Sequence, residues 1–207
     1  MIKALRIILL SIAILTASLA SYSFSDTGTT NTVVSGKEMV RGKKNAPVTI
    51  IEYASFTCPH CATFHRDIFP KLEKEYIQTG KVRFVYREVY FDAPGLWAAL
   101  VARCGGEDRY FGIIKLLYEK QKLWSLPTSQ EKIVSELLII ARQAGLNDLQ
   151  TTSCLKDSEA AQSLVKDFQR NVKNDNISST PSFLINEKLF NNISFEDIKA
   201  EIDSSFN

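Results

Sequence analysis

Several properties that would mark particular classes of protein are missing from this sequence. Its 207 residues include 25 Lys and Arg against 23 Asp and Glu, so the formal net charge is only +2. Basic residues do not gather in a stripe, which argues against nucleic acid as the main partner. Internal repeats and low-complexity segments are also missing. With 45% hydrophobic and 23% charged residues, the chain has the composition of a globular protein with one core or one domain carrying an insertion.

The N-terminal segment lacks the run of roughly 20 apolar residues that a membrane-spanning helix needs. Its apolar run at residues 7–15 is shorter, follows Lys3 and Arg6, and leads to small residues that end at Ala20. This pattern predicts a secretory signal peptide at residues 1–20, with a transmembrane anchor as the alternative. Cleavage would remove both basic residues and no acid, so the mature chain would carry no formal net charge.

The segment that follows is rich in Ser and Thr and has few large apolar side chains. This composition predicts a flexible leader at residues 21–37 and a folded domain at residues 38–207. The leader is expected to act as a spacer.

Cysteine is scarce, with four residues in the chain, but the number is even. Disulfides persist in the oxidising compartments that exported proteins reach, so the pairing of these cysteines matters. Cys58 and Cys61 form a C-x-x-C pair, whereas Cys104 and Cys154 are isolated. The isolated two could be buried free thiols. In an oxidising compartment we expect them instead to form a structural disulfide.

Hydrophobic periodicity predicts strands on both sides of a long helical region. A β-branched and aromatic run predicts a buried strand at residues 48–54, followed by a helix that carries the C-x-x-C pair. A second strand is expected at residues 81–87. Strand character returns at 180–186, Leu189 and Phe190 are expected to continue it as a hairpin, and Ser194 can cap a final helix. Residues of about 94–174 have helical periodicity, which predicts four helices at 96–103, 110–122, 128–144 and 155–172. We therefore expect an α/β fold with an all-helical insertion between the second and third core strands.

A C-x-x-C pair between a strand and a helix is suited to redox chemistry. The first thiol lies at the helix N-terminus, where free N–H groups and the helix dipole stabilise a thiolate. We therefore expect Cys58 to be the nucleophile and Cys61, almost one turn later, to be the resolving thiol. Pro59 fits the first helical turn because its missing N–H is not needed there.

Two further residues are candidates for the same chemistry. His60, between the cysteines, can add a donor or a positive charge near the thiolate, although it could also be a solvated residue at a helix start. Glu52 lies six residues before Cys58 on an otherwise apolar strand. It is either a charge at a strand edge or a buried acid that takes a proton from Cys61, and we favour the second role.

The C-x-x-C pair also occurs in zinc sites, which gives the sequence an alternative interpretation. Cys58, Cys61 and His65 could supply three ligands. A fourth is missing, because the only other histidine is His60 and the remaining cysteines are distant in sequence. We therefore expect no metal.

The chain resembles the DsbA family of periplasmic disulfide oxidoreductases. The resemblance rests on Gly42, on the run from Ala46 through Cys61, on Ala98 through Glu107, and on Thr180-Pro181-Ser182. It extends from about residue 38 to the C-terminus, and these motifs are long and specific. It implies a thioredoxin fold interrupted by a helical domain, and some members of the family have a second disulfide of the kind expected above.

The resemblance also implies roles for Thr180 and Pro181. Pro181 is expected to be the cis-proline facing the active-site disulfide, and X–Pro is the setting in which a cis bond costs least. A trans proline at the start of a strand is the alternative. The residue at the position of Thr180 pairs its backbone with an extended substrate and tunes reactivity in the family. Many of its members have Val there, so Thr180 leaves the redox strength open.

The expected function is oxidation of exported proteins that have free thiols, through a redox-active Cys58–Cys61 disulfide. The resemblance implies a periplasmic protein that a membrane oxidase re-oxidises, with no cofactor. A disulfide isomerase or reductase is the first alternative. The absence of a recognisable dimerisation segment between residues 21 and 46 favours a monomer and hence the oxidase. A chaperone-like binding module with inert cysteines is a further alternative.

Overall fold

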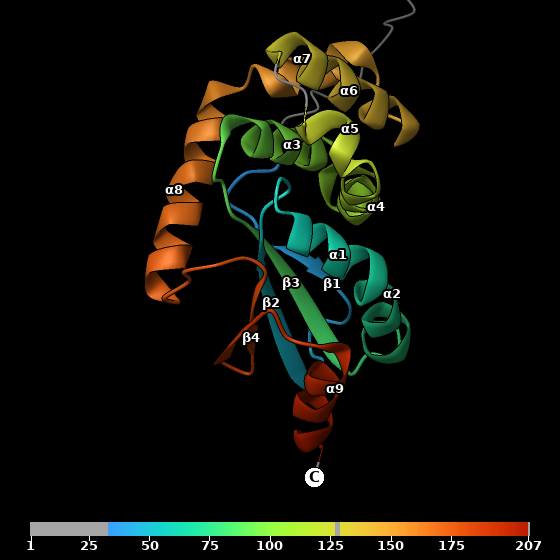
Figure 1. Cartoon of the computed structure of the whole chain (residues 1–207), viewed down its shortest axis with the longest axis vertical. Coiled ribbons are helices and arrows are strands. Elements are labelled where there is room, and N and C mark those ends of the chain that lie inside the picture. Colours follow the sequence, from blue (N-terminus) through green and yellow to red (C-terminus); the bar gives the residue numbers. More distant parts are fainter. Residues whose placement is uncertain (1–32, 127–128, 207) are drawn as a thin grey trace, which may run out of the picture. The chain divides into compact units, whose positions relative to one another are not determined.

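The computed structural model describes residues 33–126 and 129–206 (Figure 1). The expected signal peptide at residues 1–20 and most of the expected leader therefore lie outside the described residues. Within the described part, no helix is both long and apolar enough to cross a membrane.

A five-stranded sheet forms the centre of the fold, with strand order β1-β3-β2-β4-β5. The parallel pair β2 (Val48–Ala54) and β3 (Val82–Glu88) corresponds to the two strands expected from the sequence. The antiparallel strands β4 (Ser182–Ile185) and β5 (Lys188–Asn191) form the expected hairpin beside β2. The short strand β1 (Met39–Arg41), antiparallel to β3, was not predicted from the sequence.

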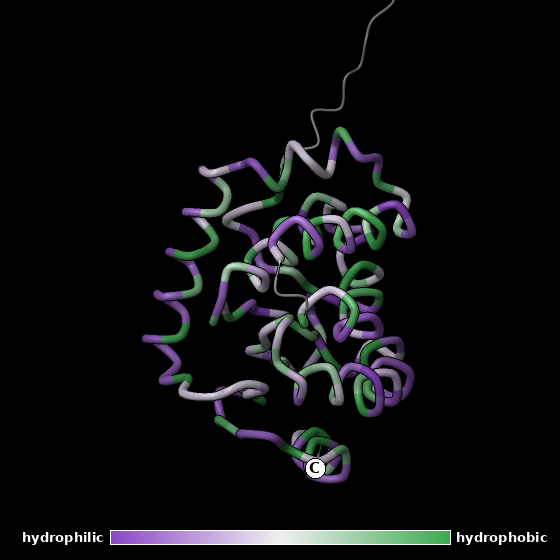
Figure 2. The backbone as a smooth tube through the Cα atoms, turned by 45° about the horizontal axis from the view of Figure 1, so that its top comes forward, coloured by the Kyte–Doolittle hydropathy of each residue, from purple (hydrophilic) through white to green (hydrophobic). Residues whose placement is uncertain are grey.

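Side chains alternate along β2 because successive residues of a strand point to opposite faces of the sheet. Ile50 and Ala54 belong to the main core, whereas Tyr53 belongs to a second, smaller cluster. Phe168 and Val172 of α8 (Ser158–Asn174) pack in that smaller cluster. Figure 2 shows α8 with hydrophobic and hydrophilic residues alternating along its turns, as a helix covering one face of a sheet requires.

The helical connection between β2 and β3 is broken, although the sequence predicts one helix. It consists of α1 (Pro59–Asp67), α2 (Phe69–Leu72) and the π-helical turn η1 (Glu73–Ile77). Pro70 explains the break, because it has no N–H to donate and its ring clashes with the preceding turn. The first of these segments nevertheless starts where the sequence predicts, directly after Cys58.

Between β3 and β4, all regular secondary structure in the described residues is helical, which agrees with the expected helical insertion (Figure 1). The sequence predicts four helices there, and the described residues form six: α3 (Ala93–Cys104), α4 (Gly106–Glu119), α5 (Gln121–Ser125), α6 (Gln130–Gln143), α7 (Asp148–Leu155) and α8. After the hairpin, Ser194 caps α9 (Phe195–Ser204) by accepting from the Asp197 N–H. The fold is therefore a thioredoxin fold in which the helical insertion lies between β3 and β4, which are the second and third of the strands expected from the sequence.

The last residues of the expected leader pack with the folded domain, which corrects the boundary drawn at residue 37. Val33 is only 5% exposed. The guanidinium group of Arg103, buried in α3, donates to the carbonyl oxygens of Val34 and Lys37 at 2.7 and 3.1 Å. A buried guanidinium has five N–H groups to satisfy, and these carbonyl groups satisfy part of that requirement.

Candidate active site

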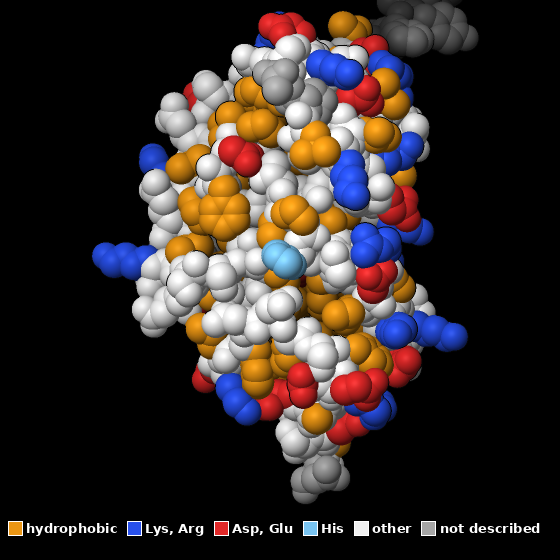
Figure 3. Space-filling view, in the orientation of Figure 1, with side chains coloured by type: hydrophobic (Ala, Val, Ile, Leu, Met, Phe, Trp, Pro, Cys, Tyr) orange, Lys and Arg blue, Asp and Glu red, His pale blue; other side chains and the backbone are white. Residues whose placement is uncertain are grey.

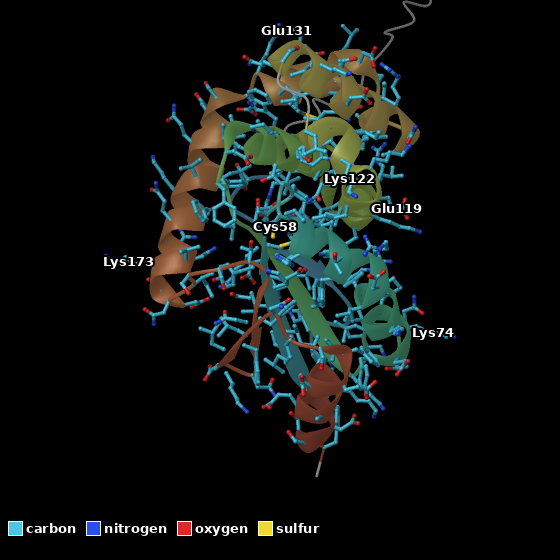
Figure 4. All side chains as sticks on the ribbon, in the orientation of Figure 1. Cys58, Lys74, Glu119, Lys122, Glu131 and Lys173 are labelled. Atoms are coloured by element: carbon cyan, nitrogen blue, oxygen red, sulfur yellow. A yellow bond between two sulfur atoms is a disulfide. The ribbon has the colours of Figure 1, made fainter. Side chains whose placement is uncertain are left out.

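Cys58 is the N-cap of α1 and lies between the insertion helices and the sheet (Figure 4). Its backbone is extended, with φ −78° and ψ 121°, and Pro59 occupies the first helical turn as expected. Cys58 is half-buried and Cys61 is fully buried, and both are free thiols in this structure. The pair is thus shown in its reduced form.

The environment of Cys58 favours a thiolate. A hydrogen bond from the Cys61 thiol has the largest effect and lowers the pKa of Cys58, whereas burial raises it. A hydrogen bond with the Thr180 side chain lowers this pKa further, as do hydrogen bonds from the backbone N–H groups of Cys61 and His60. The resulting pKa is about 5. These backbone donors are the free N–H groups of a helix start, so the local fold itself supplies part of the stabilisation.

Cys61 has the opposite electrostatic environment. Burial raises the pKa of its thiol, and the hydrogen bond to Cys58 and the negative charge of Glu52 raise it further. At neutral pH one thiol of the pair is therefore ionised and half-exposed while the other is protonated and inaccessible. This asymmetry is what separate attacking and resolving roles require.

Glu52 is completely buried in β2. Of the two roles considered for it, a charge at a strand edge does not fit, since β2 is a central strand. Burial raises the pKa of this carboxyl group, and the charge of His65 and a hydrogen bond with it oppose that effect. The separation between Glu52 Oε2 and His65 Nε2 is 2.9 Å. His65 thus contacts a carboxylate in the core, a role that the sequence did not predict for it.

The Thr180-Pro181 peptide bond is cis. The loop that contains it lies beside the dithiol, because the Cys58 sulfur is 3.5 Å from the Thr180 carbonyl oxygen. Residues separated by 122 positions in the sequence are thereby brought together. The arrangement leaves a backbone carbonyl next to the Cys58 sulfur.

Two residues of the insertion hold the active-site loop, and sequence analysis missed both. The side-chain amide of Gln121, at the start of α5, donates to the carbonyl oxygens of Phe56 and Cys58 at 2.8 and 2.9 Å. The Tyr118 hydroxyl of α4 donates to the Ser55 carbonyl oxygen at 3.2 Å. A glutamine and a tyrosine in amphipathic helices give no sequence signal for such contacts.

His60 is exposed on the surface of α1, and a hydrogen bond from its backbone N–H lowers the pKa of Cys58. The face shown in Figure 3 has one histidine at its surface with hydrophobic side chains around it, while charged side chains gather toward the periphery.

Cys104 of α3 and Cys154 of α7 form a disulfide with Cα atoms 5.9 Å apart. The bond joins two helices of the insertion and lies apart from the C-x-x-C pair in the fold. In the described part of the chain, no group of three or more His, Cys, Asp or Glu side chains could hold a metal ion.

Comparison with known proteins agrees with this geometry. A model of the thioredoxin family matches residues 34–204. Disulfide bond formation protein D of Bacillus subtilis is 33% identical over 187 residues, which cover 84% of this chain and 81% of that protein. A Rickettsia bellii protein whose name places it among protein-disulfide oxidoreductases is 31% identical over 81% of this chain, but the match spans only 64% of that relative's length.

Solved structures show the same likeness in three dimensions. Wolbachia pipientis alpha-DsbA1 is 27% identical, with a TM-score of 0.77 and coverage of 83% of this chain and 92% of that one. Oxidised BdbD from Bacillus subtilis is 28% identical, with a TM-score of 0.69, and the match covers 84% of this chain and 97% of that one. The chain belongs to the DsbA family of the thioredoxin superfamily.

Proposed function

We propose that this protein is a thiol-disulfide oxidase of exported proteins, with Cys58 as nucleophile and Cys61 as resolving thiol. The observation that carries the proposal is the contrast within the dithiol: one ionised, half-exposed sulfur at a helix start beside one buried, protonated sulfur. A stabilised thiolate is a good leaving group, so the Cys58–Cys61 disulfide is easily reduced and therefore oxidising.

In the proposed reaction, a client thiolate attacks Cys58 of the disulfide and Cys61 leaves. The client is then bound to Cys58 through a mixed disulfide. A second client thiolate attacks the client sulfur, the client disulfide forms, and Cys58 leaves as a thiolate. Two electrons pass to the protein, which ends as a dithiol and needs a membrane oxidase to become a disulfide again.

Neighbouring groups have distinct roles in this proposal. The cis bond before Pro181 presents the Thr180 carbonyl to the backbone of an extended client, which could add as a short strand. Pro59 starts the helix, and the His60 imidazole adds positive charge near the thiolate when it is protonated. The Cys104–Cys154 disulfide stabilises the insertion. No cofactor is needed, because the thiols hold the electrons.

The expected signal peptide at residues 1–20 would direct the chain to the periplasm, where it would act as a monomer. An isomerase or reductase uses the same dithiol but needs a reducing partner to maintain it. The lowered pKa of Cys58 favours the oxidase, since it stabilises the reduced state of this protein. A chaperone with inert cysteines has no use for an ionised thiol, so the geometry does not favour it.

The reduction potential and its pH dependence test the oxidase assignment. In glutathione buffers near pH 7 we expect a value nearer about −120 mV than about −270 mV. Because the pKa of Cys58 is lowered to about 5, the thiolate stabilises the reduced protein above that pH. This stabilisation is complete above the unperturbed pKa of about 8.5 and is lost as the pH falls through 5.

The slope of the potential against pH follows from the number of protons taken up. Below pH 5 reduction consumes two protons, and above it only one, so the slope changes from about 59 to about 30 mV per pH unit. A potential near that of thioredoxin, with the steeper slope continuing through pH 8, would favour the reductase instead.

A further inference from the structure

Cys61, His65 and Glu52 are all buried, and Glu52 is near enough to Cys61 for its charge to raise the pKa of that thiol. Cys61 and His65 are four residues apart in α1, so they lie on the same face of the helix. Both are buried, as is Glu52 of β2, over which that helix packs. The hydrogen bond between His65 and Glu52 joins Nε2 of the ring to Oε2 of the carboxylate, at 2.9 Å. The other carboxylate oxygen, Oε1, is buried and has no hydrogen-bond partner among the described residues.

The other titratable groups around this site are not free to exchange protons. The Tyr118 ring of α4 stacks on His65 with centroids 4.4 Å apart, and Tyr86 of β3 contacts its edge. Tyr118 donates its hydroxyl proton to the Ser55 carbonyl oxygen, which leaves Tyr86 to donate to Tyr118 at 2.6 Å. Burial also raises the pKa of each of these two tyrosines well above the ordinary value for tyrosine.

The remaining neighbours are apolar or are the thiols themselves. Phe183 of β4 lies directly opposite Glu52, and Phe64 and Phe69 pack around the His65 ring. Beneath the dithiol, proton exchange is therefore confined to Glu52, His65 and the two cysteines. An unpartnered carboxylate oxygen in such a place is costly, so its presence calls for an explanation.

We propose that His65 is a positioning residue for the resolving step: it holds Glu52 through Oε2 and so leaves Oε1 to exchange a proton with Cys61. The inference rests on the proposed thiol-disulfide exchange at Cys58 and extends it to a residue outside the C-x-x-C motif. The imidazole adds a second contribution, since in its protonated form it balances the negative charge of the buried carboxylate.

The proton and the electrons balance in each direction. When a client thiolate opens the Cys58–Cys61 disulfide, the leaving Cys61 sulfur takes a proton from the Glu52–His65 pair, and the client's negative charge ends on the Glu52 carboxylate. In the reverse direction, Glu52 takes the proton from Cys61. The resulting thiolate attacks Cys58, the intramolecular disulfide forms, and the group bound to Cys58 leaves with the electron pair.

An aromatic disulfide, dithionitrobenzoate, separates the two steps in one experiment. The reduced protein releases a first coloured thionitrobenzoate when Cys58 attacks the reagent, and a second when Cys61 resolves the mixed disulfide. Stopped-flow absorbance from pH 5 to 9 gives a rate profile for each phase. The first phase tests Cys58 chemistry, and the second phase tests the role of His65.

His65→Leu removes both the hydrogen bond and the charge. We expect its second phase to fall by about tenfold or more at its plateau and its pH midpoint to rise, because general base catalysis is typically worth 10²–10⁴-fold. His65→Gln keeps a donor for Oε2, so it should retain the plateau while its midpoint still rises. Glu52→Gln should lose about 10²-fold, and adding His65→Leu to it should cause no further loss.

Phe69→Leu is the matched control, because its side chain packs against the His65 ring without carrying a proton. It should leave both phases and their pH profiles unchanged. A wild-type second-phase profile in both His65 variants would overturn this inference, as would an equal shift in Phe69→Leu. His65→Gln decides the matter alone if His65→Leu does not fold. Absence of the first phase in the wild-type protein would overturn the proposed function instead.

Discussion

The Cys61→Ser variant should accumulate mixed disulfides with client proteins, whereas Cys58→Ser should trap none. The half-exposed Cys58 is the sulfur that a client can reach, and Cys61, with no exposed surface, can act only from within. Without the resolving thiol, stalled complexes cannot escape through Cys61. Steady-state oxidation of a dithiol client should fall by about 10³-fold or more in either variant, as is usual when a nucleophilic unit is broken.

Non-reducing gels of alkylated cell extracts, followed by mass spectrometry of the cross-linked peptides, measure the trapping. The Cys104→Ala/Cys154→Ala variant serves as a control, because it changes two cysteines and leaves the dithiol intact. It should trap no more than the wild-type protein does. Equal trapping by Cys58→Ser and Cys61→Ser would show that the two roles are assigned wrongly.

The second large effect concerns stability. Replacing both Cys104 and Cys154 by Ala should lower the free energy of unfolding by about 4 kcal/mol, since the bond closes a loop with a sequence separation of 50 residues. The bond restricts the unfolded chain and joins α3 to α7 in the folded one. Denaturant unfolding of the oxidised wild type and the variant, at equal pH, gives the difference directly.

Cys58 and Cys61 provide the internal comparison for that experiment. Mild reductant should open the disulfide between Cys58 and Cys61 first and leave the bond between Cys104 and Cys154 closed. The lowered pKa of Cys58 stabilises the reduced form of the first bond and has no effect on the second. Peptide mapping with an alkylating reagent follows both. An unchanged unfolding midpoint in the double variant would show that the disulfide contributes nothing to stability.

Local patterns in the sequence were sufficient to select Cys58 and Cys61 as the proposed redox pair. The roles proposed for them follow from a C-x-x-C between a strand and a helix, and the structure supplies the asymmetric pKa values that those roles need. The two parallel strands and the hairpin also follow from periodicity, because their side chains are buried in runs. The resemblance to a known family added Pro181 as a cis residue, which periodicity alone does not indicate.

Contacts between distant segments were beyond the reach of sequence reasoning. Gln121 lies 63 positions from Cys58, and nothing in an amphipathic helix marks which glutamine donates to an active-site carbonyl. His65 was considered only as a metal ligand, because a histidine one turn after a cysteine suggests zinc. Its partner is Glu52, which the fold of α1 over β2 brings within 2.9 Å.

The boundaries of elements were predicted less well than their existence. The break in the helix after Cys58 follows from Pro70, which a periodicity count passes over because the apolar positions continue through it. Composition assigned residues 33–37 to the flexible leader, yet the buried Arg103 donates to the carbonyl oxygens of Val34 and Lys37. In both cases a single backbone or side-chain requirement outweighed the average character of the segment.

Transfer of a disulfide to a reduced client protein tests the central claim most directly. The oxidised protein is mixed with an equimolar amount of a reduced, unfolded protein that has two cysteines, and the free thiols of each are counted by alkylation and mass spectrometry. We predict that the client loses both thiols while Cys58 and Cys61 gain theirs, at a rate that the Cys58→Ser variant does not support. A client that keeps its thiols beside a protein that keeps its Cys58–Cys61 disulfide would contradict the account.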